Sequence, residues 1–361
     1  MNISSNLYGI ATLGYIFAMI AYICYLAFRK EGIGKVASGI TLLSFASHTI
    51  AFALRWYEGY AAGLRNFWRP PISNLYESLI FFVWCLILGY IIIEFKYKNR
   101  SFGAFITPVA ALALAFIEMS GMSKQIEPLV PALQSNWLLA HVTMSFISYS
   151  MFGLAFGTAL MYLIEKTEDR KEPAYLFWTV SVGILVVLLI AMALDYLKYH
   201  VVATTPELAK AYLFKATFNS PSTAVAIASW VGAILVIALI WRYGYVLKNI
   251  ISSFRIDTAI LDELTYKIIA IGFPIFTLGG LIFGAIWADQ AWGVYWSWDP
   301  KETWSLITWF VYAFYLHARL MRGWRGKKVA VVAVVGFVTV VFTYLGVNLL
   351  LSGLHSYGGL K

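Results

Sequence analysis

Charged residues are scarce in this chain of 361 residues. They make up 12% of it, whereas hydrophobic residues make up 61%; a soluble domain is about 25% charged and about half apolar. This composition excludes an ordinary soluble domain. Uncharged apolar runs of about 20 residues recur along the chain, which is the length that a helix needs to cross a bilayer. Because these runs do not alternate polar with apolar residues, they predict helices rather than the strands of a barrel.

Cysteine is nearly absent. Cys24 and Cys85 each stand alone within an apolar run, which excludes a disulfide framework, a CxxC pair and a zinc site. Both are expected to be small buried apolar side chains. The N-terminal stretch MNISSNLYGI lacks a basic region and a small-residue cleavage site. We therefore expect the first apolar run to be retained as a helix rather than removed as a signal peptide.

The apolar runs predict an all-α integral membrane protein, a polytopic bundle of about ten transmembrane helices that forms a single membrane domain over residues 1–361. The expected helices cover residues 7–28, 36–56, 73–94, 103–119, 138–164, 174–196, 223–243, 266–286, 304–319 and 329–351. Residues 165–265 form an extra helical hairpin region with an outer loop, and this region carries little distinctive chemistry. No internal repeat is visible.

Lysine and arginine are distributed unequally between the two sides of the predicted bundle. One set of loops holds 18 of the 27 basic residues and the other set holds 9. Cytoplasmic loops carry the excess of basic residues, so the richer set is predicted to be cytoplasmic. Both termini and the loop at 286–303 are then on the outer side. The net charge of +9 therefore reflects topology and does not indicate a nucleic-acid partner.

The chain has only five histidines: His48, His141, His200, His317 and His355. His141 lies near the outer end of the fifth predicted helix, and His355 lies just beyond the outer end of the tenth. His48 and His317 are each about 18–20 Å deep in the membrane, from the helical rise per residue. A histidine inside a membrane helix is a functional hypothesis, with an interhelical hydrogen bond as the alternative. His200 is expected on the surface of an outer loop.

Tryptophans and carboxylates gather in WADQAWGVYWSWDPKETW, residues 287–304. The stretch holds five of the fourteen tryptophans, together with Asp289, Asp299 and Glu302. An aromatic belt at the membrane interface explains scattered tryptophans. It does not require the fixed spacing of WGVYWSWD or its glycine and aspartate, so this spacing favours a ligand site. The segment Pro300–Glu302 has a simpler interpretation, because proline and acidic residues often start a helix.

Histidines and tryptophans together suit haem, a flat apolar macrocycle with one metal and two carboxylates. Such a ligand needs aromatic faces, axial nitrogen ligands and cations for its propionates. The loop at 286–303 supplies faces, and His141 and His355 supply nitrogen atoms. Guanidinium groups pair well with carboxylates, and three arginines are predicted on the same side: Arg55, Arg65 and Arg69.

The string Trp292-Gly293-Val294-Tyr295-Trp296-Ser297-Trp298-Asp299 resembles the signature WGxxWxWD of the haem-handling WWD proteins. Three branches share this signature: CcsA (also called ResC), CcmC and CcmF. The longer strings WGVYWSWDPKETW, FTYLGVNLLLSGLHSYG and WLLAHVTMSFISYSMFG look like CcsA. The resemblance is dense over residues 131–157 and 265–358 and patchier over 42–80.

The resemblance implies a cytochrome c biogenesis protein, in which haem b is the substrate of a holocytochrome c synthase (a thioether-forming haem lyase). His48 and His317 match two histidines that hold haem within the membrane, and His141 and His355 match two that flank the external loop. The resemblance also implies that this loop cradles haem through Trp292, Gly293, Trp296, Trp298 and Asp299.

The same resemblance implies three kinds of partner: a membrane subunit of the CcsB (ResB) type, an apocytochrome c that presents CxxCH, and thiol-reducing proteins. The location it implies is the bacterial cytoplasmic membrane. This chain has no CxxCH motif of its own and is therefore not a c-type cytochrome. No nucleophile–base pair is evident, so positioning of the two reactants is the expected source of catalysis.

Three other functions remain open on the sequence. A CcmC-like protein would deliver haem without forming thioethers. A small-molecule permease would use helices broken by glycine and proline, but it would need neither the tryptophan string nor the histidine pairs. A membrane electron-transfer cytochrome would retain haem bound by two histidines.

Overall fold

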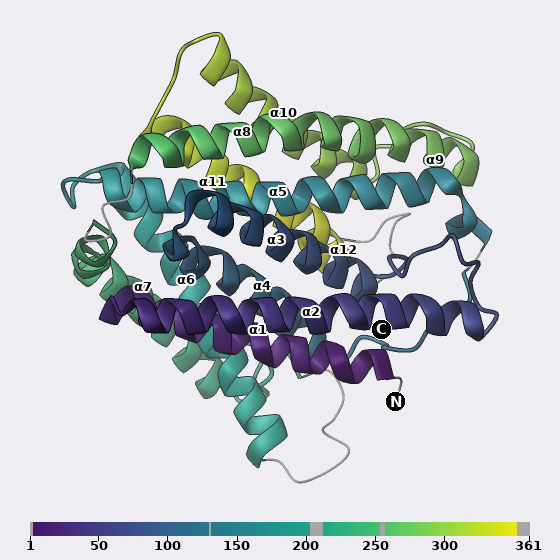
Figure 1. Cartoon of the computed structure of the whole chain (residues 1–361), viewed down its shortest axis with the longest axis horizontal. Helices are drawn as coiled ribbons and strands as arrows, with labels where there is room; N and C mark the ends of the chain where they lie inside the picture. The colour runs from purple at the N-terminus through teal and green to yellow at the C-terminus, as the bar shows by residue number, and fades with distance from the viewer. Residues whose placement is uncertain (1–2, 130, 203–211, 253–256, 352–361) are drawn as a thin grey trace.

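The computed structural model describes residues 3–129, 131–202, 212–252 and 257–351, and these residues form helices and no strand (Figure 1). The long helices are α1 (Ile3–Phe28), α2 (Glu31–Ala61), α3 (Leu75–Tyr97), α4 (Gly103–Met119), α5 (Asn136–Lys166), α6 (Pro173–Tyr196), α7 (Thr223–Ser252), α8 (Thr258–Phe276), α9 (Gly284–Trp292), α10 (Pro300–Leu320) and α11 (Lys327–Val341). Shorter pieces are η1 (Arg100–Phe102), η2 (Pro131–Gln134), η3 (Leu197–Val202), η5 (Thr277–Phe283), η6 (Phe342–Gly346) and α12 (Val347–Leu350).

Each of the ten predicted helices is present. The π-helical segment η5 joins α8 to α9 without a break, and η6 joins α11 to α12 in the same way. Within the described ranges, nine helical spans are long and apolar enough to cross a membrane. The remaining predicted span, at 304–319, belongs to α10, which carries charged residues in its first and last turns. The prediction of an all-α polytopic membrane protein is confirmed.

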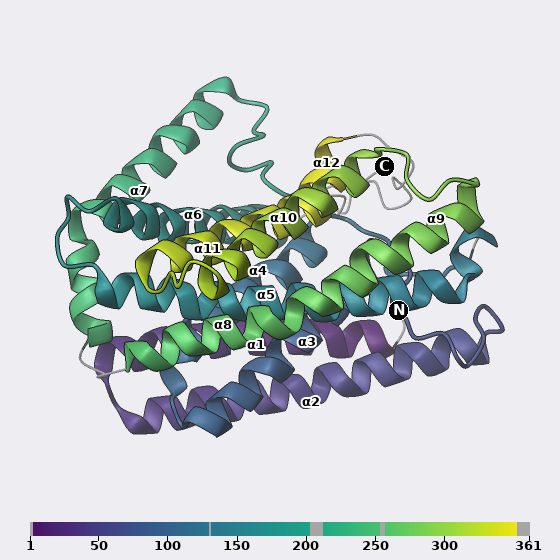
Figure 2. The ribbon, with the colours of Figure 1, turned by 90° about the horizontal axis from the view of Figure 1, so that it is seen from above.

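Helix α5 is the centre of the bundle, and it is the most buried of the candidate spans. It packs against α3, α4, α8 and α11, and both views place it between the α1–α2 pair and α10 (Figures 1 and 2). Two glycines on α5 allow this close packing. A Cβ atom at Gly153 would lie 3.1 Å from Leu86, and one at Gly157 would lie 3.1 Å from Ile106. Small residues let membrane helices approach because lipid offers no hydrophobic drive between them.

The region 165–265 packs onto the bundle through α6, which contacts α4 and α5, and through α7, which contacts α5 and α1. Helix α7 lies along α6 and projects from the bundle in Figure 2. The Tyr175 hydroxyl donates a hydrogen bond of 2.7 Å to the Trp241 carbonyl, and Gly244 leaves room for the buried Trp178. The apolar window of α7 has no buried residue, so most of this helix faces outward. Cys24 and Cys85 are free and half-buried.

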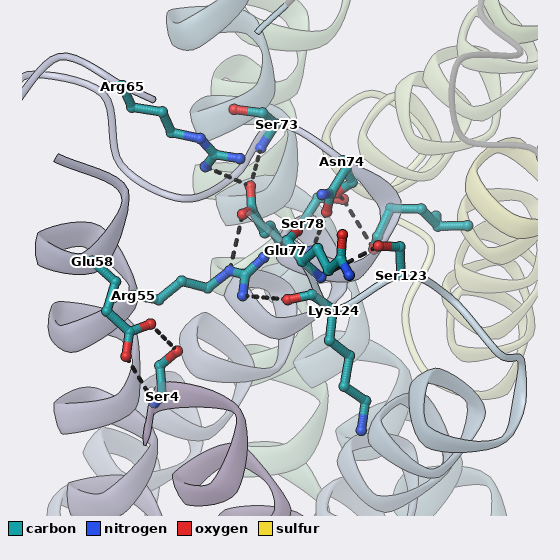
Figure 3. Close-up of polar contacts among 12 residues, drawn as sticks. Ser4, Arg55, Glu58, Arg65, Ser73, Asn74, Glu77, Ser78, Ser123 and Lys124 are labelled. Atoms are coloured by element: carbon teal, nitrogen blue, oxygen red, sulfur yellow. Dashed lines mark hydrogen bonds and ion pairs between the residues drawn. The ribbon is translucent and has the colours of Figure 1, made fainter. Parts of the chain in front are cut away.

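A buried ion cluster fastens the end of the bundle where α3 begins (Figure 3). Glu77 is fully buried, and its carboxylate accepts hydrogen bonds of 2.9 Å from both Arg55 and Arg65 and one of 3.0 Å from the Ser73 amide. Arg55 also donates to the carbonyls of Lys124 and Gln125. The cluster therefore ties α2 and α3 to the loops at 62–74 and 120–135.

We predict that Glu77→Gln destabilises the fold by about 3–5 kcal/mol, because it leaves two buried guanidinium groups without their carboxylate. The midpoint of thermal unfolding in detergent measures this. The matched control is Glu31→Gln, since Glu31 pairs with Arg100 at the surface, where an ion pair contributes below about 1 kcal/mol. Equal midpoints for the two variants would contradict the assignment.

Candidate functional site

A cavity of about 320 Å³ opens at the end of the bundle that carries the tryptophan-rich loop. The start of α3, the start of α5, helix α9, the first turn of α10 and helix α12 contribute to its wall. Of the predicted site residues, His141, Trp296, Arg65 and Arg69 line this cavity. The following residues also line it, although the sequence did not single them out as site residues: Trp287, Tyr295, Lys301, Tyr344 and Asn348.

His141 is held by a backbone carbonyl. Its Nδ1 atom lies 2.7 Å from the carbonyl oxygen of Gly279, which can only accept a hydrogen bond, so Nδ1 carries the proton. With the proton on Nδ1, a neutral ring carries its lone pair on Nε2, which is the form of imidazole that binds a metal. Gly279 belongs to the π-helical segment η5, and π-helical turns are frequent at functional sites. Gly284 makes room for the ring, because a Cβ atom there would lie 2.8 Å from Nδ1.

Two tryptophans of the loop, Trp287 and Trp292, belong to α9, and two others, Trp296 and Trp298, lie between α9 and α10. Trp287 is buried and lies parallel to the His141 ring, with ring centroids 6.4 Å apart. Trp292 packs edge-on against Trp287, with ring centroids 4.8 Å apart. Trp296 lines the cavity, and its Nε1 donor is buried without a hydrogen-bond partner in the described part of the chain. Trp298 is 68% exposed and has a φ of +60°. A side chain in this left-handed region costs about 1 kcal/mol or more, so the fold holds Trp298 in a strained position.

Gly293 and Asp299 mark the two ends of the segment between α9 and α10. Gly293 has a φ of +77° and ends α9 by donating to the Asp289 carbonyl, which is the usual place for a glycine after a helix. Asp299 caps α10 and accepts a hydrogen bond from the Lys301 amide, while Glu302 reaches back to the Asp299 amide. This capping box confirms the interpretation of this segment as a helix start.

The three predicted arginines have different surroundings. Arg55 does not line the cavity, and its guanidinium is used by Glu77 and two carbonyls. Arg65 lines the cavity, and its Nε is buried and unpartnered among the described residues. Arg69 also lines it and donates to carbonyls around η2, including those of Leu133 and Ser135. Of the three predicted arginines, Arg65 and Arg69 therefore reach the cavity and Arg55 does not.

Lys301 is a further cation of the cavity. Its Nζ lies 3.3 Å from Asn348 Oδ1 and 5.7 Å from the centre of the Tyr344 ring. It precedes the apolar run 304–319 and is therefore outside the membrane span. Burial lowers the pKa of Lys301 to about 8, against the opposing effect of Asp299. An amine removed from water in this way gains from an anionic neighbour.

Trp287 could have been found from spacing alone. Gly280, Gly284 and Trp287 recur at intervals of four and three residues, which puts them on one face of a helix. All three line the cavity. Lys301 carried a weaker signal, as one of the few basic residues on its side of the predicted bundle.

The two membrane histidines lie apart. His48 is fully buried, its Nδ1 lies 3.3 Å from the Tyr15 hydroxyl, and its Nε2 has no partner in the described ranges. His317 is exposed on α10. Helix α2 packs against α1 and α3, whereas α10 packs against α8 and α11 (Figure 2). The structure therefore does not bring the two imidazoles together.

The remaining histidines are His200 and His355. His200 is exposed, stacks on Tyr196 at 4.8 Å and lies within hydrogen-bond distance of the Tyr212 hydroxyl. His355, the predicted second ligand of the external site, lies outside the described residues.

Comparison with known proteins places these residues in a family. The family model described as "Cytochrome C assembly protein" matches residues 72–355. A protein of Porphyra purpurea named "Cytochrome c biogenesis protein CcsA" is 39% identical over 96% of this chain and 95% of its own length. Proteins of the same name from Gloeobacter violaceus and Synechocystis are 40% identical (93% of this chain, 90% of theirs) and 36% identical (99% and 98%).

The matched region holds the cavity-lining part of α5, the tryptophan-rich loop and α10 together. The relatives match this chain over nearly its full length, so the likeness extends to the whole bundle. The chain therefore belongs to the cytochrome c assembly family, among its CcsA proteins.

Proposed function

We propose that this protein acts in cytochrome c biogenesis by holding haem, its substrate, in the cavity beside His141 and presenting it to an apocytochrome c. The observation that carries the proposal is the His141 imidazole. A backbone carbonyl orients it so that Nε2 can bind a metal, and it lies against an aromatic wall. The names of the relatives, which refer to cytochrome c biogenesis, support the same function.

The residues of the cavity fit haem as a ligand. Trp287 and Trp296 offer flat apolar surfaces, and Arg65 and Arg69 offer cations for carboxylates. Two buried donors, Trp296 Nε1 and Arg65 Nε, have no hydrogen-bond acceptor among the described residues. A polar ligand in the cavity would satisfy them. We place His355 as the second axial ligand, following the resemblance of its sequence context.

The proposed reaction is the addition of two thiols to two vinyl groups. Each cysteine S–H of the CxxCH motif adds across a C=C bond of haem, so that one C–S and one C–H bond form and no net oxidation occurs. This addition needs alignment of the reactants more than a strong acid or base. The contribution of this chain is then to fix the plane of haem through His141, Trp296 and the cavity cations.

A partner of the CcsB (ResB) type is proposed to complete the synthase, and thiol-reducing proteins to keep the CxxCH cysteines reduced. The membrane is proposed to be the bacterial cytoplasmic membrane, with the tryptophan-rich loop and both termini on the outer side. His48 and His317, which stand on the helices α2 and α10, stay a predicted membrane site for haem.

The first test is the absorption spectrum of the protein purified with its proposed partner. We expect a low-spin haem spectrum that His141→Gly weakens several-fold and that added imidazole restores, because free imidazole replaces the missing ligand. His200→Gly is the matched control, since His200 is exposed and does not line the cavity. A wild-type protein without any Soret band would overturn haem handling and favour a permease. Haem retention without thioether formation in an assembly assay would favour delivery of the CcmC kind.

A second prediction concerns the space around the His141 ring. Gly284→Ala puts a methyl group 2.8 Å from Nδ1, so the ring must move and its bond to the Gly279 carbonyl must lengthen. We expect haem content to fall several-fold while the melting midpoint changes little. Gly232→Ala is the control, because nothing lies within 4 Å of a Cβ atom there. Equal haem content in the two variants would show that the position of His141 is not critical.

The proposed topology predicts the labelling of single cysteines in a background without Cys24 and Cys85. Val294→Cys, in the exposed part of the tryptophan-rich loop, should react with a membrane-impermeant maleimide in intact cells. Arg322→Cys, in the loop between α10 and α11, should react only after permeabilisation. The reverse pattern would invert the orientation derived from the basic residues.

A further inference from the structure

Lys301 reaches the cavity from a turn that the protein fixes firmly. Asp299 and Glu302 form the capping box of α10 on either side of it, and Glu302 also accepts from the Ser297 amide. The Glu302 carboxylate is thus occupied by backbone donors. Among the described residues, no carboxylate lies within ion-pair distance of Lys301. The amine lines the cavity, and among the described residues Asp299 acts on its charge only from beyond ion-pair distance.

The partners of Lys301 hold the amine in place without offering it a full counter-charge. Asn348 Nδ2 donates to the Tyr344 carbonyl at 2.5 Å, which turns the amide so that its Oδ1 atom is available to Lys301. That contact, at 3.3 Å, is long. The Tyr344 ring adds a weak attraction for the cation at 5.7 Å. The Tyr344 hydroxyl is in turn hydrogen-bonded to Ser78 of α3.

The other cations of the cavity differ from Lys301 in this respect. Arg65 is ion-paired with Glu77 at 2.9 Å, and Arg69 donates to carbonyls near η2. Both enter the cavity from the loop between α2 and α3, whereas Lys301 enters from α10. The cavity therefore carries one cation on α10 whose charge is left for a ligand, separate in the chain from the two arginines.

We propose that Lys301 binds a carboxylate of the ligand in the cavity and thereby selects ligands that carry an acid group. The inference rests on the proposed function, under which this carboxylate is one propionate of haem. Lys301 is then a binding residue that sets the orientation of the macrocycle within its plane. Tyr344 and Asn348 act through it as positioning residues. A neutral porphyrin ester of the same shape would lose this contact and keep the aromatic ones.

The experiment compares two probes in the purified protein: haem and its dimethyl ester, in which both propionates are masked. Dissociation constants are measured from the Soret band in detergent for wild type, Lys301→Gln and Lys301→Arg. We expect Lys301→Gln to weaken haem binding by about tenfold or more, the size of one charge-assisted hydrogen bond. The same variant should bind the dimethyl ester as wild type does, and Lys301→Arg should keep most of the affinity for haem. Lys198→Gln, at an exposed lysine outside the cavity lining, is the control.

The outcomes separate this inference from the proposed function. If wild type binds haem and Lys301→Gln binds haem equally well, Lys301 is not a ligand contact, while haem handling stands. If Lys301→Gln weakens haem and the ester by the same factor, the lysine only supports packing, and the inference fails. Binding of the ester at wild-type affinity shows in the same titration that the variant is folded. Absence of haem binding by wild type would overturn the proposed function and this inference together.

Discussion

Hydrocarbon cannot satisfy backbone polar groups, and this constraint decides where a site can be built in this protein. Within the membrane each amide and carbonyl must be bonded inside its own helix. Functional backbone groups are therefore confined to helix ends and to places where the helical register changes. The cavity lies where α3, α5 and α10 begin and α9 ends, and the carbonyl that orients His141 comes from the π-helical segment η5.

The rim of the cavity is built on buried charge. Glu77 joins two arginines and the Ser73 amide, and Arg55 extends the network to the carbonyls after α4. A buried ion pair of this kind gives little net stability, but losing one partner is costly. Its effect is to hold the loop that brings Arg65 and Arg69 to the cavity.

The fold could be predicted because length and polarity of an apolar run are local properties, and the capping signals at Asp299–Glu302 are local as well. The lateral arrangement could not be predicted. Sequence position gives the depth of His48 and His317 along their helices, but it says nothing about which side of the bundle each helix occupies. For the same reason, the charge of a residue and its predicted side of the membrane could not distinguish Arg55 from Lys301. Arg55 is ion-paired with Glu77, whereas Lys301 lines the cavity.

The choice of a carbonyl to orient His141 bears on how firmly a metal would be held. A carboxylate in that position would raise the basicity of the imidazole and strengthen its bond to iron. A neutral carbonyl fixes the ring and the tautomer with less of this effect. On the proposed function, haem is a substrate that must leave when the histidine of CxxCH replaces one axial ligand. An imidazole whose Nδ1 is held by the Gly279 carbonyl suits a ligand that has to be exchanged.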